Sequence, residues 1–70
     1  MAQVEASITG TVWKIEVSVG DEIEEGDTVV ILESMKIEMP MEAEDAGTVT
    51  EIRVEEGQAV SEGDVLVVLS

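Results

Sequence analysis

The sequence predicts an all-β domain built from two antiparallel sheets. Valine and isoleucine dominate its apolar residues, and they occur in short runs separated by turn sequences such as those at Gly20 and Gly26. β-branched residues favour strands, and Gly-Asp pairs favour tight turns between them. No stretch shows the 3.6-residue periodicity of an amphipathic helix. A small all-β chain buries its apolar faces against each other, so we expect a flattened β-barrel, or barrel-sandwich, of two antiparallel sheets.

The second half of the chain repeats the first. The Gly-Thr-Val sequence that begins at Gly10 recurs at Gly47, and the Glu-Gly-Asp sequence around Gly26 recurs around Gly63, in both cases 37 positions later. A constant offset indicates two copies of one supersecondary unit. We therefore expect a pseudo-two-fold axis between the halves, with residues 35–36 on the link and the two chain ends close together on the opposite side.

Alternation of apolar and polar residues sets the expected strands. In the segment 11–19, Val12 and Lys14 would share one face, while Trp13 and Ile15 share the other. On this pattern Trp13, the sole aromatic residue, is expected to be a core side chain. We expect strands at residues 4–9, 11–19, 28–34, 37–42, 47–54 and 65–69, and very short strands near Ile23 and Val60.

The turns and one strand contain residues with specific backbone requirements. Gly26 and Gly63 should adopt positive φ, which glycine takes without a Cβ clash. Met39 and Met41 alternate with polar or ring residues, so they should pack in the core or along an edge. Pro40, between them, should mark a strand end or an edge strand, because it has no backbone N–H to donate.

Composition excludes several kinds of function. Seventeen Asp and Glu residues against three Lys and Arg residues give a formal charge of −14, which would repel a nucleic-acid backbone. Cysteine and histidine are absent, which removes thiolate nucleophiles, disulfides and the common zinc ligands. The acidic pairs Glu24-Glu25 and Glu55-Glu56 flank turns, so we expect solvated side chains rather than acid–base catalysts. We assign no catalytic residue and no metal ligand, and we expect the protein not to be an enzyme.

Length and hydropathy bound the organisation of the chain. Seventy residues are enough for one domain, which we expect to span residues 1–70. The N-terminal residues lack the positive and apolar regions of a signal peptide, and no apolar run approaches the roughly 18 residues that span a bilayer. We therefore expect a cytoplasmic protein with no membrane contact, and the strong negative charge favours a monomer for the isolated domain.

Met35 and Lys36 occupy the position of a two-residue hairpin loop between the strands 28–34 and 37–42. The favoured loops of this length need positive φ and are rich in asparagine and glycine. Other residues in that conformation cost on the order of 1 kcal/mol or more, and strain of this kind points to function. A lysine at a hairpin tip presents an amine on a four-carbon stem, which suits covalent attachment. Lys14 lies mid-strand and is a poor attachment site.

The residues around Lys36 resemble the Glu-Ala-Met-Lys-Met-Glu signature of biotinyl domains. Ser34 stands where alanine is usual, and Ile37 stands where methionine follows the lysine. The segment that begins at Gly10 and the Gly-Asp turns also look like this family, so the resemblance covers nearly the whole chain. It points to the biotinyl/lipoyl-domain family, and within it to free-standing biotin/lipoyl attachment proteins. The matching residues are Glu33-Ser34-Met35-Lys36-Ile37-Glu38.

The resemblance implies a barrel-sandwich fold with Lys36 as the acceptor of covalent biotin. It also implies that a biotin protein ligase reads the residues beside that lysine, namely Glu33, Ser34, Met35 and Ile37. The implied function is that of a biotin carboxyl carrier, which shuttles CO2 between a biotin carboxylase and a carboxyltransferase.

Two alternatives stay open. One is a lipoyl carrier, with lipoate on the lysine, for a dehydrogenase complex or the glycine cleavage system. The other is an unmodified adaptor domain. Lipoyl domains typically show Asp-Lys-Ala, so Met35 favours biotin.

Overall fold

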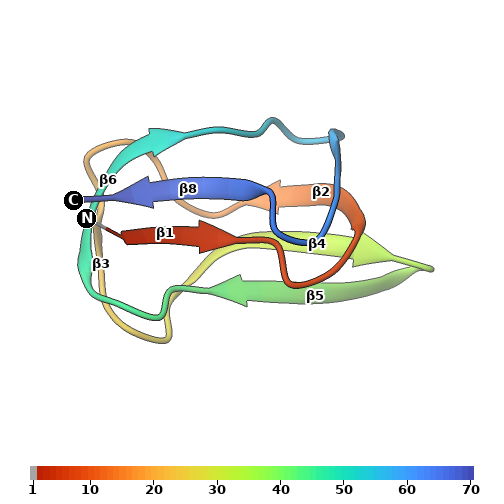
Figure 1. The fold of residues 1–70 in the computed structure, drawn as a ribbon, viewed down its shortest axis with the longest axis horizontal. Coiled ribbons are helices and arrows are strands. Elements are labelled where there is room, and N and C mark those ends of the chain that lie inside the picture. Colours follow the sequence, from red (N-terminus) through yellow and green to blue (C-terminus); the bar gives the residue numbers. More distant parts are fainter. Residues whose placement is uncertain (1) are drawn as a thin grey trace.

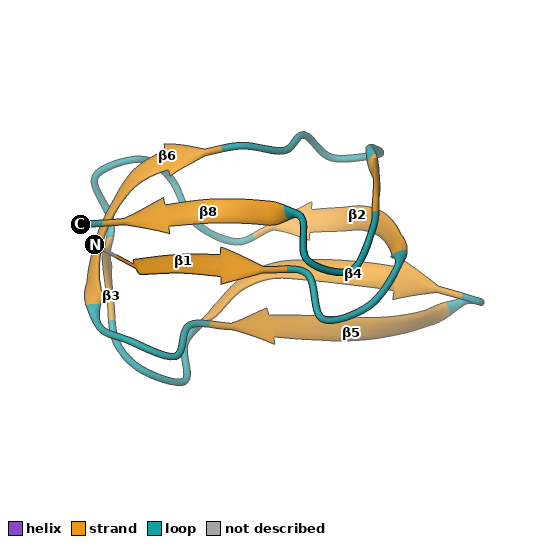
Figure 2. Cartoon of the chain, in the orientation of Figure 1, coloured by secondary structure: helices purple, strands orange, loops and turns teal. Residues whose placement is uncertain are grey.

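The computed structural model describes residues 2–70, which form two four-stranded sheets with the orders β1-β8-β6-β3 and β5-β4-β2-β7 (Figure 1). All strand pairs are antiparallel. The predicted all-β fold of two antiparallel sheets is therefore confirmed, and no helix in residues 2–70 could cross a membrane (Figure 2). The strands are β1 Ala2–Glu5, β2 Gly10–Ile15, β3 Glu22–Ile23, β4 Thr28–Ser34, β5 Ile37–Glu42, β6 Gly47–Ile52, β7 Ala59–Val60 and β8 Val65–Leu69.

The internal repeat is present in the structure. A shift of 37 positions converts β1 to β4 into β5 to β8, and it converts one sheet order into the other. Hydrogen bonds repeat in the same way: the Ala6 N–H donates to the Asp64 carbonyl, and the Ala43 N–H donates to the Asp27 carbonyl, both at 2.9 Å. The two sheets are therefore related by the predicted pseudo-two-fold axis.

The two ends of the described chain lie side by side at one end of the molecule. Ala2 pairs with Leu69 and Val4 pairs with Val67 in the first sheet. Figure 1 shows the start of β1 and the end of β8 at the end of the molecule opposite the β4–β5 turn. The predicted placement of the chain ends is confirmed, and the β4–β5 turn is left free of neighbouring termini.

A single apolar core lies between the sheets. Val29, Leu32 and Leu66 are fully buried, and no polar or charged residue among residues 2–70 is buried. Met41 is also in the core, whereas Met39 is 39% exposed on β5, which is an edge strand. Both methionine placements match the expectation of core or edge packing, as does the position of proline within an edge strand.

A β-bulge reverses the predicted orientation of Trp13. Val12 pairs with Leu32 and Lys14 pairs with Ile31, so Trp13 is an extra residue without a partner on β4. The bulge shifts the alternation by one position: Val12 is 1% exposed, and Trp13 is 42% exposed. The prediction that Trp13 fills the core is therefore wrong.

The first strand differs from its predicted bounds at both ends. It was expected at residues 4–9 but runs from Ala2 to Glu5. Ala6 then bonds to the turn before β8: its N–H donates to the Asp64 carbonyl, and its carbonyl accepts from the Gly63 N–H at 2.8 Å. This turn contact replaces strand pairing, and the chain bends away from β8.

Two further strands end earlier than predicted. β2 ends at Ile15 instead of residue 19, and β6 ends at Ile52 instead of residue 54. After β2 the chain crosses to the other sheet, where the Gly20 N–H donates to the Val49 carbonyl at 2.8 Å. In the sequence, apolar and polar residues keep alternating beyond the last paired residue of the strand. The alternation therefore could not show where the strand ends and the chain crosses to the other sheet. The bounds predicted for residues 28–34, 37–42 and 65–69 are confirmed.

The Glu-Gly-Asp turns have the predicted backbone. Gly26 has φ of 91° and Gly63 has φ of 93°. In each turn an aspartate closes the loop: Asp27 Oδ2 accepts from the Glu24 N–H at 2.9 Å, and Asp64 Oδ2 accepts from a backbone N–H at 2.8 Å. These residues determine the shape of the scaffold, which holds the β4–β5 hairpin.

Candidate functional site

The β4–β5 hairpin closes through a turn of only two residues. Ser34 pairs with Ile37, so Met35 and Lys36 alone make the connection. Met35 has φ of 53° and Lys36 has φ of 65°, and they are the only non-glycine residues with positive φ in residues 2–70. Positive φ at both central residues is what the favoured type I′ hairpin turn requires. The predicted left-handed conformation at this turn is confirmed.

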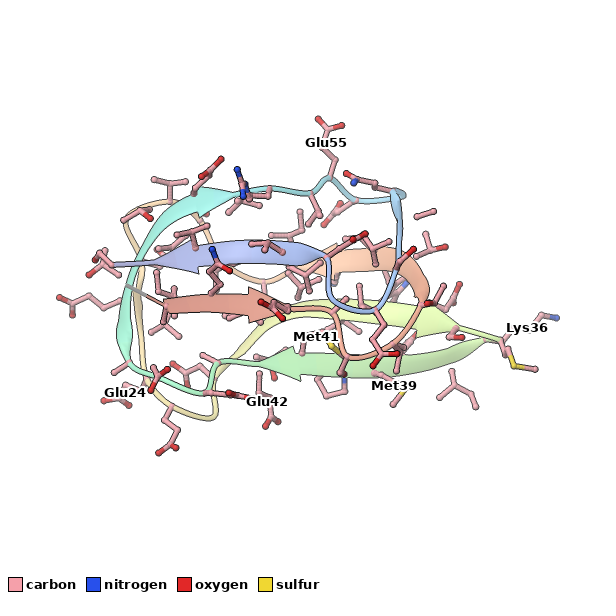
Figure 3. All side chains as sticks on the ribbon, in the orientation of Figure 1. Glu24, Lys36, Met39, Met41, Glu42 and Glu55 are labelled. Atoms are coloured by element: carbon pink, nitrogen blue, oxygen red, sulfur yellow. The ribbon has the colours of Figure 1, made fainter. Side chains whose placement is uncertain are left out.

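The turn projects from the body of the protein. Figure 3 shows the Lys36 side chain at the far end of the hairpin, directed away from both sheets. Met35 is 91% exposed and Ile37 is 63% exposed. The only ion pair within residues 2–70 joins Arg53 to Glu51, so none engages the Lys36 amine. The amine is therefore open to another molecule from several directions.

The base of the hairpin is anchored in the core. Leu32 is fully buried and pairs with Met39, and Met41 is buried two pairs further from the turn, opposite Val30. Between this anchor and the turn, Glu33 pairs directly with Glu38. The predicted site residues thus lie together on one short hairpin with a buried base, and two carboxylates lie near the lysine.

Gly10 is a positioning residue, a role that was not predicted from the sequence. A Cβ at this position would lie 2.6 Å from the Glu33 backbone oxygen, which is closer than real Cβ contacts. Gly10 therefore allows β2 to approach β4 immediately before the turn. Gly47 has the same role against Ser70, where the distance is also 2.6 Å. The recurrence of glycine at both places was the signal that could have identified this role.

The other acidic residues do not form a comparable site. Glu24, Glu25, Glu55 and Glu56 are exposed, as predicted. The Glu56 carboxylate accepts a backbone hydrogen bond from the Ile15 N–H at 3.2 Å. Within residues 2–70 no group of three or more Asp and Glu side chains is arranged to hold a metal ion.

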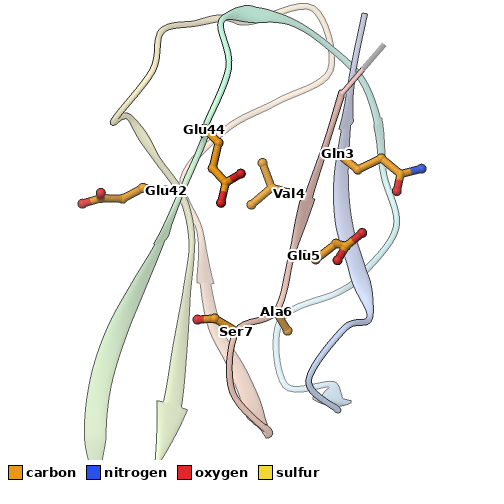
Figure 4. A pocket seen from close by; sticks show the side chains of 7 residues that line it. All are labelled: Gln3, Val4, Glu5, Ala6, Ser7, Glu42 and Glu44. Carbon is orange, nitrogen blue, oxygen red and sulfur yellow. The ribbon is translucent and has the colours of Figure 1, made fainter.

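A shallow groove of about 320 Å³ lies between the edge strands β1 and β5. In Figure 4, Glu44 points into the space between these strands. Lys36 does not line this groove or the smaller one beside it. The groove is lined by Gln3, Val4, Glu5, Ala6, Ser7, Glu42 and Glu44. The lysine at the tip is therefore not placed to serve a small-molecule pocket in the body of the protein.

The sequence profile of the family described as biotin-requiring enzyme matches residues 1–69. The chain belongs to this biotinyl/lipoyl family. The biotin/lipoyl attachment protein of Bacillus subtilis is 50% identical over 40 residues, a match that covers 57% of this chain and 55% of that protein. The biotinylated protein TB7.3 of Mycobacterium tuberculosis is also 50% identical over 40 residues, covering 57% of this chain and 56% of that protein. The match thus spans about half the length of these relatives.

A solved structure extends the likeness to the whole fold. The crystal structure of the Kluyveromyces lactis urea carboxylase contains a region that superimposes with a TM-score of 0.92 and 38% sequence identity. The match covers 99% of this chain and 6% of the urea carboxylase chain. The same fold therefore occurs as a small part of a much larger carboxylase.

Proposed function

We propose that residues 1–70 form one biotin carboxyl carrier domain, with biotin joined by an amide bond to Lys36. In this reaction the Lys36 Nζ attacks the activated carboxyl carbon of biotin, forms the amide and expels the activating group. Bound biotin would then supply the ring nitrogen that carries CO2 from a biotin carboxylase to a carboxyltransferase. The chain itself catalyses none of these steps.

The observation that carries the proposal is the turn at Met35 and Lys36. Both residues have positive φ, a backbone that asparagine and glycine adopt most readily in two-residue hairpin turns. Keeping two non-glycine residues there costs on the order of 1 kcal/mol each. That cost is offset if the turn is needed for its side chains, and the exposed amine of Lys36 is suited to attachment.

The surroundings of Lys36 fit a covalently attached group. Lys36 lines neither of the two grooves in the body of the protein, which fits a cofactor held by a bond rather than by a pocket. The buried Leu32 and Met41 fix the base of the hairpin, which leaves motion to the lysine stem and the attached arm. Because the cofactor is tethered to the chain, it does not diffuse freely, and its local concentration is high at each of the two active sites in turn.

Biotin is preferred over lipoate as the attached group. Met35 precedes the lysine where lipoyl domains typically have an aspartate, and the mycobacterial relative is named as biotinylated. The Bacillus subtilis relative is named for both cofactors, so lipoate is the second candidate. The family match and the region shared with a urea carboxylase support the carboxylation role.

Transfer of labelled CO2 tests the carrier role. The chain is first biotinylated by a biotin protein ligase and then incubated with a biotin carboxylase, ATP and radioactive bicarbonate. We expect acid-labile radioactivity to accumulate on the chain up to about one equivalent and to be lost when a matching carboxyltransferase and its acceptor are added.

The matched controls replace one lysine at a time. Lys36→Arg keeps the charge but has a guanidinium that stays protonated and is not nucleophilic, so it should carry no label. Lys14→Arg should carry label like the wild type. A fully biotinylated chain that never acquires labelled CO2 would rule out the carboxyl carrier role while leaving attachment intact.

A further inference from the structure

Trp13 is an exposed aromatic residue that the fold does not require. The corresponding bulge in β6 leaves Thr50 without a partner, because Val49 pairs with Leu69 and Glu51 pairs with Val68. Thr50 Oγ1 donates to a backbone carbonyl on β8 at 3.2 Å, so a small polar residue satisfies this position. The first half has a tryptophan there, 42% exposed. Large aromatic residues left exposed on a surface are typical of contact sites.

The two sheets also differ in the side chains beside Trp13 and Thr50, on the outer face of each sheet. Lys14, Ile31 and Pro40 form a row across β2, β4 and β5, next to Trp13. The Lys14 Nζ lies 5.5 Å from the centre of the Trp13 ring, within the range of a cation–π contact. The equivalent row of the other sheet is Glu51, Val68 and Gln3. The sheet that carries the hairpin therefore presents the larger apolar surface.

Two carboxylates lie on this face between Trp13 and the turn. Buried Leu32 points inward, so alternation places its neighbour Glu33 outward, and Glu33 pairs directly with Glu38. Like charges in directly opposed positions are destabilising by roughly 0.2–1 kcal/mol, and neither carboxylate has an ion-pair partner among residues 2–70. Cationic side chains on a partner would relieve this repulsion.

We propose that this face, centred on Trp13, is where the enzyme that attaches the cofactor to Lys36 docks, through an apolar surface bordered by lysine or arginine. The inference rests on the proposed function. It goes further by naming a recognition surface outside the turn: Trp13, Ile31 and Pro40, together with the pair Glu33 and Glu38.

The short distance between this face and Lys36 favours the attaching enzyme as the docked partner over the biotin carboxylase and the carboxyltransferase. The Ile31–Pro40 pair lies three pairs from Ser34–Ile37, which is roughly 10 Å at about 3.3 Å per residue. A typical interface covers about 800 Å² on each partner, a patch of about 16 Å radius. An enzyme that brings a carbonyl to the Lys36 amine must sit on the hairpin and would cover this face. Enzymes that act on the attached group reach it at the end of a long arm.

The opposite side of the hairpin is less open. The connection between β1 and β2 packs there, and the Ser7 hydroxyl donates to the Met41 sulfur at 3.3 Å. On the outer face, by contrast, Trp13 and Pro40 are exposed. A docked partner would therefore meet the outer face without displacing any part of the fold.

Ligation kinetics test the docking surface. The variant Trp13→Thr introduces the residue that the second repeat uses at the same bulge. Initial rates of biotinylation are measured over a range of chain concentrations with one biotin protein ligase. We expect KM to rise about tenfold, the equivalent of about 1.4 kcal/mol, with kcat changed less than twofold. Val19→Thr is the matched control, since it removes a 63% exposed apolar residue elsewhere and should change neither constant.

The outcomes separate docking from attachment. If wild type is biotinylated at Lys36 and Trp13→Thr has the same KM, the docking surface is wrong and the proposed function stands. If wild type is not biotinylated at all, the proposed function itself fails.

A second measurement does not depend on the folding of the Trp13 variant. Lys36→Arg, labelled with 15N, is titrated with unlabelled ligase, and the single indole N–H resonance is followed. We expect it to shift or broaden together with the turn amides. An indole signal that stays unchanged while the turn amides respond would overturn the proposal.

Discussion

The glycine turns and the turn at Met35-Lys36 use positive φ for different purposes. Gly20, Gly26 and Gly63 have φ between 91° and 99°, beyond the range that residues with a Cβ comfortably adopt. Met35 and Lys36 have φ of 53° and 65°, within the small left-handed region that such residues enter at a cost. The glycine turns thus have the residue that the backbone requires. The hairpin turn keeps side chains that the backbone disfavours.

The two kinds of turn also differ in their supporting contacts. Each Glu-Gly-Asp turn is closed by an aspartate, such as Asp64, and is bonded to the other half of the chain through its glycine N–H. Within residues 2–70, the Met35-Lys36 turn is held only by the strand pairs below it, beginning with Ser34 and Ile37. Strain is therefore concentrated where the backbone is least tied to the scaffold and where the lysine is most exposed.

The largest effect should come from replacing a turn glycine. Gly63→Val should destabilise the protein by about 1–3 kcal/mol, because φ of 93° is unfavourable for a β-branched residue, and Gly26→Val should behave alike. Urea unfolding of each variant measures the change. Glu62→Val, at an exposed neighbour, is the control and should change stability by less than about 0.5 kcal/mol. An unchanged midpoint for both glycine variants would show that these turns do not depend on glycine.

A substitution at the hairpin turn should instead increase the stability of the protein. Met35→Asn places a residue favoured in type I′ turns at the first turn position, so stability should rise by up to about 1 kcal/mol. Lys36 remains available, and its modification can be checked in the same sample. Thermal unfolding of both proteins at one salt concentration measures the difference. A loss of stability in Met35→Asn would mean that the methionine is not strained there.

The smallest expected effect concerns the choice of cofactor. Met35→Asp adds a carboxylate beside Lys36, and exposed charge interactions are worth up to about 1 kcal/mol, or about fivefold in a rate ratio. Parallel incubations with a biotin ligase and a lipoyl ligase give the ratio of initial rates for each protein. Wild type should favour biotin, and Met35→Asp should move the ratio toward lipoate. Faster lipoylation of wild type would reassign the carrier to the second candidate.

The sequence predicted those features that depend on local pattern. The strands 28–34 and 37–42, the two-residue turn and the positive φ of Gly26 and Gly63 follow from alternation and turn residues, and the structure has them. Trp13 could not be placed correctly, because a bulge depends on pairing with β4 and leaves no mark in the alternation of β2 itself. Comparison with the second repeat, which has Thr50 at that position, is the evidence in the sequence that a core aromatic was not required.

Strand ends and close approaches depend on contacts between distant segments. Ala6 leaves β1 because it bonds to the turn at Gly63 and Asp64, which lies far along the chain. The need for glycine at position 10 depends on the Glu33 carbonyl, which β4 brings against β2. Both features are tertiary, so the pattern of one segment could not predict them.

Mapping by peptide mass shows which lysine carries the attached group. The chain is co-expressed with a biotin protein ligase, its intact mass is measured, and its proteolytic peptides are sequenced by mass spectrometry. We expect one biotin per chain, on Lys36, and none on Lys36→Arg, whose thermal unfolding should match the wild type. Biotin on Lys14, or labelling that persists in Lys36→Arg, would contradict the assignment of the hairpin turn as the attachment site.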